Sequence, residues 1–278
     1  MKTFLLSLIF CILCLFSNAQ DFIWAKSMGG SGSERGYGIA TDVNGNIYTT
    51  GYFNSSVDFD PGVGTNIISC VGGTDGFITK LDANGNLVWA LSLAGTGTLS
   101  IYAPPAIDNS GNLYITGNFS GVVDFDPSLS TYTATGTNDI FILKLTATGS
   151  FVWAKNIGGS SFESARRIIT DASNNIYLAG MYTGIVDFDP SAATYTLSSN
   201  SSSTDGFILK LDPSGNFIWV NGIGGVGTDI CASIALDVSN NLYATGSYSA
   251  TVDFDPSAAT YNLNSSGDYD ILDRKSVV

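Results

Sequence analysis

Histidine is absent from the 278 residues of this chain. Its absence excludes Ser-His-Asp and Cys-His catalysis and every histidine-ligated metal site. Positive charge is also scarce, with 11 lysine and arginine residues against 24 acidic residues and a net charge of −13. This balance argues against nucleic acid or an anionic membrane surface as a partner. Only 7 residues are proline and 44% are hydrophobic, so we expect a folded chain with a sizeable core.

A hydrophobic run long enough to cross a bilayer as a helix, roughly 20 residues, is missing as well. The longest run, 4–16, follows the positive charge of Lys2 and precedes small residues at 17–19, which is the pattern of a secretory signal peptide. We predict a cleaved signal peptide over residues 1–19, with a retained membrane anchor as the alternative. The mature chain is expected to begin at Gln20, to be secreted or held at the cell surface, and not to insert into the membrane.

Cysteine is rare too. Cys11 and Cys14 leave with the signal peptide, so Cys70 and Cys231 remain in the mature chain. Export would permit a disulfide, but these two residues lie about 160 positions apart in non-adjacent repeats. We predict two isolated, buried thiols.

Internal repeats organise the rest of the chain. Four tryptophans recur at intervals of 65, 64 and 66 residues, at Trp24, Trp89, Trp153 and Trp219. The segment Val-Asp-Phe-Asp-Pro occurs four times, at 57–61, 123–127, 186–190 and 252–256. A tyrosine followed three residues later by glycine recurs at Tyr48, Tyr114, Tyr177 and Tyr243. An Asp-x-Phe-Ile-x-Lys-Leu segment begins at Asp75, Asp139 and Asp205.

Each repeat predicts short strands and not helices. Apolar residues flank turns such as 42–46, and Asn-Gly between alternating apolar residues is typical of a β-hairpin. Two hairpins make a four-stranded sheet, and tandem four-stranded sheets pack radially in a β-propeller. We therefore predict an all-β protein, a β-propeller of four-stranded blades with repeats of about 65 residues, in an incomplete ring of three to four blades. A right-handed parallel β-helix is the alternative.

The predicted propeller covers residues 20–272, in approximate units 24–88, 89–152, 153–218 and a truncated 219–272. Residues 22–26 match the fourth strand of later units, such as 151–155. In a closed ring, this N-terminal strand would complete the last blade. The tryptophans are predicted to be core anchors that pack between neighbouring blades.

These repeats resemble a known family. The segment 36–53, together with Val-Asp-Phe-Asp-Pro and Asp-Gly-Phe-Ile-Thr-Lys-Leu, resembles the SBBP-type β-propeller repeats of secreted bacterial proteins, chiefly from the Bacteroidetes. The resemblance covers about residues 21–271. It implies the fold but no activity, because the family has no single known chemistry.

The fourth unit departs from the repeat after Asp270-Ile271. The equivalent segment 139–145 predicts a phenylalanine next, but the chain continues Leu-Asp-Arg-Lys-Ser-Val-Val. The last six of these residues are what a common sequencing adapter encodes in one reading frame. We interpret residues 273–278 as a sequencing artefact and expect the native gene to continue.

The Asp-Phe-Asp-Pro box holds the metal candidates. Alternation along a strand places its two aspartates on one side and its phenylalanine on the other. Paired carboxylates with loop carbonyls suit calcium, which takes six to eight oxygen ligands. The candidate calcium ligands are Asp58, Asp60, Asp124, Asp126, Asp187, Asp189, Asp253 and Asp255. The alternative is a buried phenylalanine anchor whose aspartates cap backbone amides before a turn.

Other acidic residues suggest no catalysis. Asp42, with Asn44 and Asn46, is interpreted as a hairpin turn closed by side-chain hydrogen bonds. Glu34 and Glu163 precede the first strand of their units and are expected to be solvated loop carboxylates, or else to line a central face. Glycoside hydrolysis needs one differentiated carboxylate pair, so identical pairs in every repeat argue against it.

The sequence therefore predicts an exported, non-catalytic β-propeller that acts as a binding or adhesion scaffold at or outside the bacterial cell surface. Its expected partners are an extracellular polysaccharide or a protein surface, with no nucleic acid. Calcium is the candidate cofactor. The alternative is a fragment of an exported carbohydrate-active enzyme whose catalytic residues lie in blades beyond this sequence.

Overall fold

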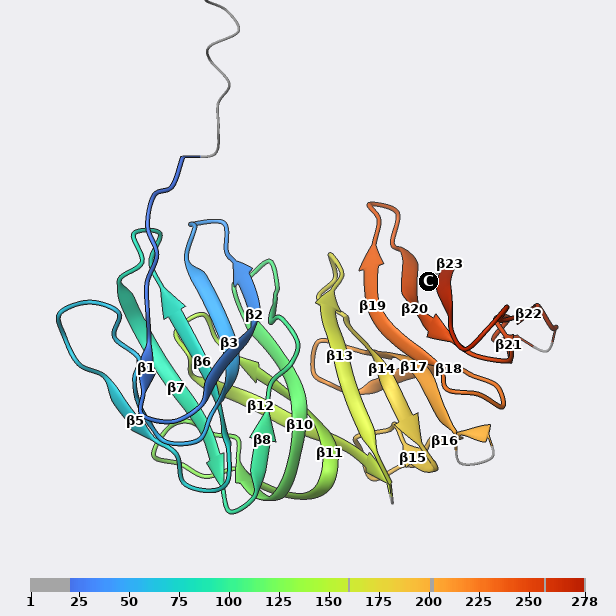
Figure 1. Ribbon diagram of the computed structural model, residues 1–278, viewed down its shortest axis with the longest axis horizontal. Helices are drawn as coiled ribbons and strands as arrows, with labels where there is room; N and C mark the ends of the chain where they lie inside the picture. Colours follow the sequence, from blue (N-terminus) through green and yellow to red (C-terminus); the bar gives the residue numbers. More distant parts are fainter. Residues whose placement is uncertain (1–20, 160, 201–202, 258, 278) are drawn as a thin grey trace, which may run out of the picture.

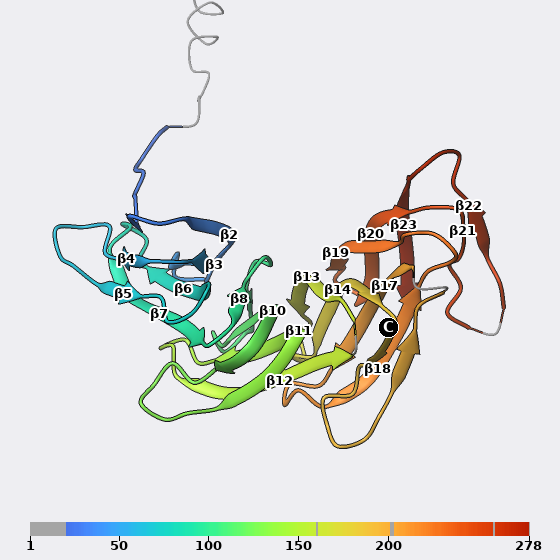
Figure 2. The same ribbon diagram turned by 60° about the horizontal axis from the view of Figure 1, so that its bottom comes forward.

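The computed structural model describes residues 21–159, 161–200, 203–257 and 259–277. The predicted signal peptide lies outside these residues. Within them, the chain forms strands and turns without an α-helix, as predicted, and no helix of this part is long and apolar enough to cross a membrane. The strands build four antiparallel units, blades 1 to 4, which are arranged side by side in an open arc (Figures 1 and 2).

The blades follow one another along the chain. Blade 1 consists of β2 (Glu34–Thr41), β3 (Ile47–Phe53), β6 (Asp75–Leu81) and β7 (Leu87–Gly95). Blade 2 consists of β8 (Thr98–Ser100), β9 (Ala106–Ile107), β10 (Leu113–Asp124), β11 (Thr133–Leu145) and β12 (Phe151–Gly159). Blade 3 consists of β13 (Glu163–Thr170), β14 (Ile176–Thr183), β17 (Thr204–Leu211) and β18 (Phe217–Ile223). Blade 4 contains β19 (Ile230–Leu236), β20 (Asn241–Tyr248) and β23 (Asp270–Val277).

The hairpin turns confirm the expected Asp-Asn chemistry. Asp42 Oδ1 accepts hydrogen bonds from the backbone amides of Asn44 (2.9 Å) and Asn46 (3.0 Å). Gly45 adopts a φ of +76°, a left-handed conformation that glycine takes without strain. Equivalent aspartates accept the same pair of amides at Asp82, Asp108, Asp171, Asp212 and Asp237.

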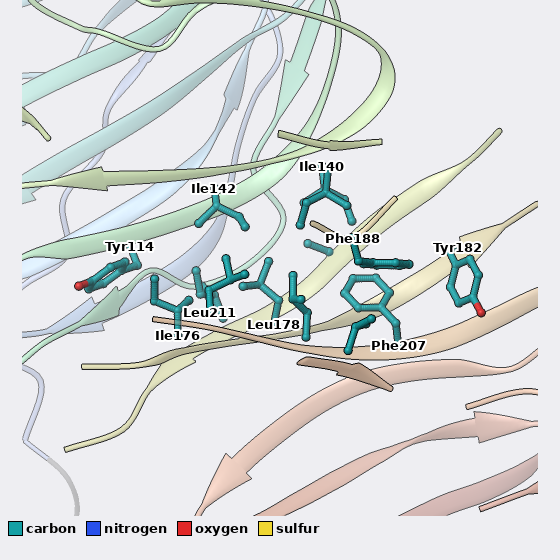
Figure 3. Packing of buried hydrophobic residues seen from close by; sticks show 14 of the residues in the cluster. Tyr114, Ile140, Ile142, Ile176, Leu178, Tyr182, Phe188, Phe207 and Leu211 are labelled. Atoms are coloured by element: carbon teal, nitrogen blue, oxygen red, sulfur yellow. The ribbon is translucent and has the colours of Figure 1, made fainter. Parts of the chain in front are cut away.

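The hydrophobic core lies between the blades. Figure 3 shows one such layer, in which Tyr114 and Ile142 of blade 2 face Leu178, Phe207 and other residues of blade 3. Similar buried clusters join blade 1 to blade 2 and blade 3 to blade 4. Both faces of the inner blades are therefore covered, which explains why β11 and β17 carry consecutive apolar residues instead of alternating ones.

The surplus of each repeat forms a small ribbon that holds the preceding blade. Blade 1 carries β4 (Ser56–Asp58) and β5 (Ile67–Ser69), and the later ribbons are the ends of β10 and β11, the pair β15 (Ile185–Asp187) and β16 (Thr196–Ser198), and the pair β21 (Thr251–Asp253) and β22 (Asn262–Asn264). Each ribbon pairs with the end of the previous last strand, as Gly158 of β12 does with Asp187. The three later ribbons therefore join neighbouring blades, and the ribbon of blade 1 joins β1 (Gly29–Gly30) to that blade.

The N-terminal segment occupies the place of a preceding last strand. Only β1 (Gly29–Gly30) is regular, and it pairs with β4 as β12 pairs with β15. Residues 22–26, predicted as a strand, form none, and the side chains of Phe22 and Ile23 are exposed. The matching segment of a later unit, such as β12, is the last strand of its blade and pairs with the strand before it. Residues 22–26 pair with no strand among the described residues.

Residues 273–277 continue β23, which pairs with β20 along its whole length. Asp273 and Arg274 stand at the positions that Ile142 and Leu143 hold in blade 2, where both side chains are fully buried. Asp273 is exposed and Arg274 is half-buried.

Candidate functional site

The first strands of the blades lie next to one another, so that β2, β9, β13 and β19 form the inner side of the arc (Figure 2). Three of the blades interrupt the first strand with a bulge that leaves one residue out of the ladder: Tyr37 in blade 1, Arg166 in blade 3 and Ala232 in blade 4. Bulges redirect side chains and are frequent beside binding sites. In blade 2, Tyr102 lies in the irregular segment between β8 and β9.

A glycine beneath each of these first strands explains the recurring Tyr-x-x-Gly motif. A Cβ atom on Gly180 would lie 2.0 Å from the carbonyl oxygen of Ser164, just before the bulge. The equivalent distances are 1.9, 2.1 and 1.8 Å at Gly51, Gly117 and Gly246. The glycine therefore gives the first strand room to approach its neighbour.

Three tyrosines cluster on the inner side of blades 1 and 2. The ring centroid of Tyr37 lies 5.7 Å from that of Tyr52, in a stacked arrangement, and 5.1 Å from that of Tyr102, in an edge-to-face arrangement. Tyr37 and Tyr102 are 44% and 38% exposed, so this tyrosine cluster lies at the surface. The hydroxyl of Thr50 donates to the carbonyl of Ala103 (3.1 Å), which fixes the two blades together below the rings.

Arg35 adds a positive charge to the tyrosine cluster. Its guanidinium group and the hydroxyl of Tyr52 lower the pKa of Tyr37, with Arg35 as the main cause. Reciprocally, the hydroxyl of Tyr37 raises the pKa of Arg35. The cluster thus combines aromatic rings, phenolic hydroxyl groups and a cation.

A cleft of about 310 Å³ continues from Tyr102 toward blade 3. Its lining consists of Thr98, Ser100, Tyr102, Asn118, Asn138, Phe162, Ser164 and Arg166. The side-chain amide of Asn118 donates to the carbonyls of Asn138 (3.3 Å) and Glu163, so it joins blade 2 to blade 3. Asn138 has a φ of +140°, a strained conformation for a residue other than glycine, of a kind that concentrates at functional sites.

Two carboxyl groups are buried behind the cleft. Glu163, the first residue of β13, has no exposed surface, and neither of its oxygens completes a hydrogen bond within the described residues. Burial, and then the charge of Asp139, raise its pKa to about 8. Asp139 differs, because its Oδ1 accepts from the backbone amide of Thr137 (3.0 Å).

The expectation that Glu34 and Glu163 are solvated loop carboxylates is therefore wrong. Glu163 and Asp229 are fully buried, and Glu34 is half-buried. Asp229 has a structural role, which is to hold blades 3 and 4 together. Its carboxylate accepts hydrogen bonds from the backbone amides of Gly225 (2.8 Å) and Ser249 (3.1 Å) at the junction of these blades. The physical reason is that the ribbons cross between blades at these points. Gly159, which pairs with Val186 of a ribbon, lies beside Glu163. Gly225, which bridges to Val252 of the next ribbon, donates its amide to Asp229.

Comparison with known proteins agrees with this architecture. Residues 23–57 match the SBBP beta-propeller repeat. The chain is a β-propeller repeat protein that carries an SBBP-type repeat at residues 23–57. It is similar to the uncharacterized WD repeat-containing protein L264 of Acanthamoeba polyphaga mimivirus, with 26% identity over 77% of this chain and 17% of that protein. It is also similar to the regulatory protein FlaEY of Caulobacter vibrioides, with 24% identity over 54% of this chain and 16% of that protein. The chain thus aligns with about a sixth of each relative.

In this β-propeller, the Asp-Phe-Asp-Pro boxes are arranged as turns. Asp58 Oδ1 accepts the backbone amides of Asp60 (3.0 Å) and Asn66 (2.8 Å), and Asp60 Oδ1 accepts that of Gly62 (2.8 Å). Phe59 is buried. The hydrogen bonds from the backbone amides of Asn66 and Asp60 lower the pKa of Asp58. The pairs Asp124/Asp126, Asp187/Asp189 and Asp253/Asp255 repeat these bonds.

Calcium binding at the boxes stays a prediction. The hydrogen bonds of each box reach Oδ1 of its two aspartates. The described residues contain no cluster of three or more histidine, cysteine, aspartate or glutamate side chains arranged for a metal ion. Carbonyl oxygens and water would have to supply most of the ligands.

The repeated tryptophans of the propeller are half-buried links between blades. Trp89 of β7 contacts the ring of Tyr48 in its own blade, with 6.0 Å between centroids, and lies beside Gly149 of blade 2. Lys80 places its amino group 5.0 Å from the centre of the Tyr48 ring on the same face. Trp89, Trp153 and Trp219 pack against the buried clusters between blades, as predicted, but none of them is fully buried. Trp24 belongs to none of these clusters among the described residues. Cys70 and Cys231 are free thiols, as predicted, but only Cys231 is buried.

Sequence reasoning missed the tyrosine cluster and the cleft. Tyr37 precedes the hairpin aspartate Asp42 by five residues, and Tyr102 precedes Asp108 by six. The first strand is also the least repeated part of the unit, and that variation was the available sign of a binding surface. Arg166 stands at the same bulge position as Tyr37.

Proposed function

We propose that this SBBP propeller is an exported, non-catalytic scaffold that binds a polysaccharide outside a bacterial cell, through the inner side of blades 1 to 3. The observation that carries this proposal is the exposed cluster of Tyr37, Tyr52 and Tyr102 at the mouth of a polar cleft. The C–H faces of sugar rings stack on aromatic rings, while sugar hydroxyl groups bond to phenol, amide and hydroxyl side chains.

The rigidity of the site supports binding. Tyr37 and Tyr52 belong to strands of blade 1, and Gly38 allows the backbone at Ala103 and Pro104 of blade 2 to pack directly against β2. Side chains held on packed strands lose little conformational freedom when a ligand arrives, so more of the contact energy appears as affinity.

Export is supported by the sequence of residues 1–19. A chain in which only 13% of the residues are charged, with hydroxyl and amide side chains on its loops, suits a neutral or weakly charged polymer surface. A protein surface is the other partner considered.

The burial of the acidic residues supports a non-catalytic role. Glycoside hydrolysis requires two carboxyl groups that reach the scissile bond. Glu163 is the acid with the most strongly raised pKa near the cleft, yet it has no exposed surface and cannot contact a sugar without movement of the chain. The alternative function, a fragment of a carbohydrate-active enzyme, becomes an outcome of the test.

The test is a glycan array followed by titration calorimetry with each polysaccharide that binds. We expect Tyr102→Ala to weaken binding at least tenfold, because it removes the ring shared by the cluster and the cleft. The matched control is Tyr261→Ala, which removes an equally large ring that is 63% exposed in blade 4 and should leave affinity unchanged. Melting temperatures verify that both variants fold.

Three results would contradict the proposal. Absence of binding to every glycan would refute the polysaccharide ligand. Equal loss of affinity in the two variants would place the site elsewhere. Release of reducing ends from a bound polysaccharide would favour the carbohydrate-active enzyme.

A further inference from the structure

We infer that the cleft between blades 2 and 3 recognises the carboxylate of an acidic sugar, a uronate unit within a polysaccharide, and that Arg166 is the residue that selects it. This inference rests on the proposed function, because it names the class of sugar that the same inner surface takes.

The distribution of arginine points to an anionic ligand. The chain has a net charge of −13 and only four arginines, yet Arg35, Arg166 and Arg167 all belong to the first strands β2 and β13. An acidic protein thus concentrates its arginines on the inner side of the arc. Local positive charge attracts and orients an anion even when the net charge of the protein is negative.

The bulge in β13 presents Arg166 to the cleft. Arg166 is left out of the ladder between Ala165 and Arg167, its side chain is exposed, and it lines the cleft. Blade 4 carries Ala232 at the equivalent bulge. The cation at this position is therefore specific to blade 3 and is not required by the fold of the repeat.

The neighbouring acids leave the charge of Arg166 available. Glu163 lies three residues away, and burial together with the charge of Asp139 raises its pKa to about 8, so it is protonated at neutral pH. Asp139 Oδ1 is held by the amide and hydroxyl groups of Thr137, at 3.0 and 3.3 Å. Neither carboxyl group belongs to the lining of the cleft.

The arrangement of the lining fits one sugar ring beside a carboxylate. Tyr102 belongs both to the tyrosine cluster and to the cleft, so a sugar stacked on its ring places the adjoining sugar of the chain within the cleft. There, Asn138, Ser100 and Ser164 offer amide and hydroxyl groups to sugar hydroxyls. The planar guanidinium group of Arg166 can bind both oxygens of a carboxylate, an arrangement that a lysine ammonium group cannot copy.

The experiment compares an acid with its uncharged ester. Affinities are measured for oligogalacturonate and for alginate oligomers, and for their methyl and propylene glycol esters, which keep the sugar backbone but remove the charge. The proteins are the wild type, Arg166→Gln, Arg166→Lys, Tyr102→Ala and the control Lys26→Gln. Lys26 is exposed in the N-terminal segment, so this control changes the net charge by the same amount.

We expect the wild type to bind at least one acid ten times more tightly than its ester, and less tightly as NaCl rises from 50 to 500 mM. Arg166→Gln should lower the affinity for the acid about tenfold and leave the affinity for the ester unchanged. Arg166→Lys should restore only part of it, and Lys26→Gln should have no effect.

The outcomes separate this inference from the proposed function. If acid and ester bind equally and Tyr102→Ala weakens both, the polysaccharide site stands and selection of uronate by Arg166 is wrong. If Lys26→Gln lowers acid binding as much as Arg166→Gln, general charge attraction explains the preference and the inference is wrong. If none of these sugars binds while the glycan array detects other ligands, the uronate assignment alone fails. If nothing binds in either experiment, the proposed function fails with it.

Discussion

Replacing Glu163 by glutamine should make the protein more stable at alkaline pH. The carboxyl group has a pKa of about 8 in the folded chain against 4.5 for an ordinary glutamate. The folded state therefore holds a proton that the unfolded state releases above about pH 4.5. Stability falls as the pH rises from about 4.5 to about 8, because ionising the buried group costs free energy. Glutamine keeps the shape of the side chain and cannot ionise.

The magnitude follows from the same pKa values. A tenfold difference in proton affinity is worth about 1.4 kcal/mol, so the full effect is at most roughly 5 kcal/mol. Relaxation of the chain around the charge reduces it, and we expect roughly 2–4 kcal/mol of additional stabilisation in Glu163→Gln at pH 9 relative to pH 5. For a chain of this size, that corresponds to a gap in melting temperature that widens by roughly 5–15 °C.

Thermal unfolding followed by circular dichroism at pH 5, 6, 7, 8 and 9 measures this gap. Asp82→Asn is the control, because hydrogen bonds from the Asn86 amide and side chain lower the pKa of Asp82, so it is ionised in both states over this whole range. Its effect on the melting temperature should be the same at each pH. Parallel curves for wild type and Glu163→Gln would show that Glu163 carries no buried proton and would refute the reasoning.

Three further predictions concern the boxes, the glycines and export. If calcium binds the boxes, millimolar CaCl₂ should raise the melting temperature of the wild type. The double variant Asp58→Asn/Asp60→Asn should show a smaller rise in melting temperature. An equal rise with MgCl₂ would identify the boxes as turns only. Gly180→Ala should destabilise the protein by about 2–4 kcal/mol in urea unfolding, because the added Cβ would overlap the Ser164 carbonyl. The control Gly267→Ala should leave stability unchanged, because the space around Gly267 is open. Expressed with its own N-terminus in a bacterial host, the chain should leave the cytoplasm with Gln20 as its first residue, and mass spectrometry of an intact, unexported chain would contradict the signal peptide.

The sequence by itself determined the repeat, and with it the fold. Hairpin aspartates such as Asp42 bond to amides within four residues, so the turn is specified locally and can be predicted from the sequence. The boxes are equally local, since Asp58 reaches only as far as Asn66. Radial packing follows because four-stranded units with apolar faces must cover one another.

Only the tertiary structure decided what the unrepeated residues do. Tyr52 and Tyr102 are 50 residues apart in sequence, and the pairing of blades 1 and 2 brings their rings within 6.3 Å. Glu163 was expected to be solvated because it stands at the end of a loop, yet the crossing ribbon and Asp139 of the preceding blade bury it. Burial and charge at a junction depend on two blades at once, and one repeat read in isolation contains only half of each junction.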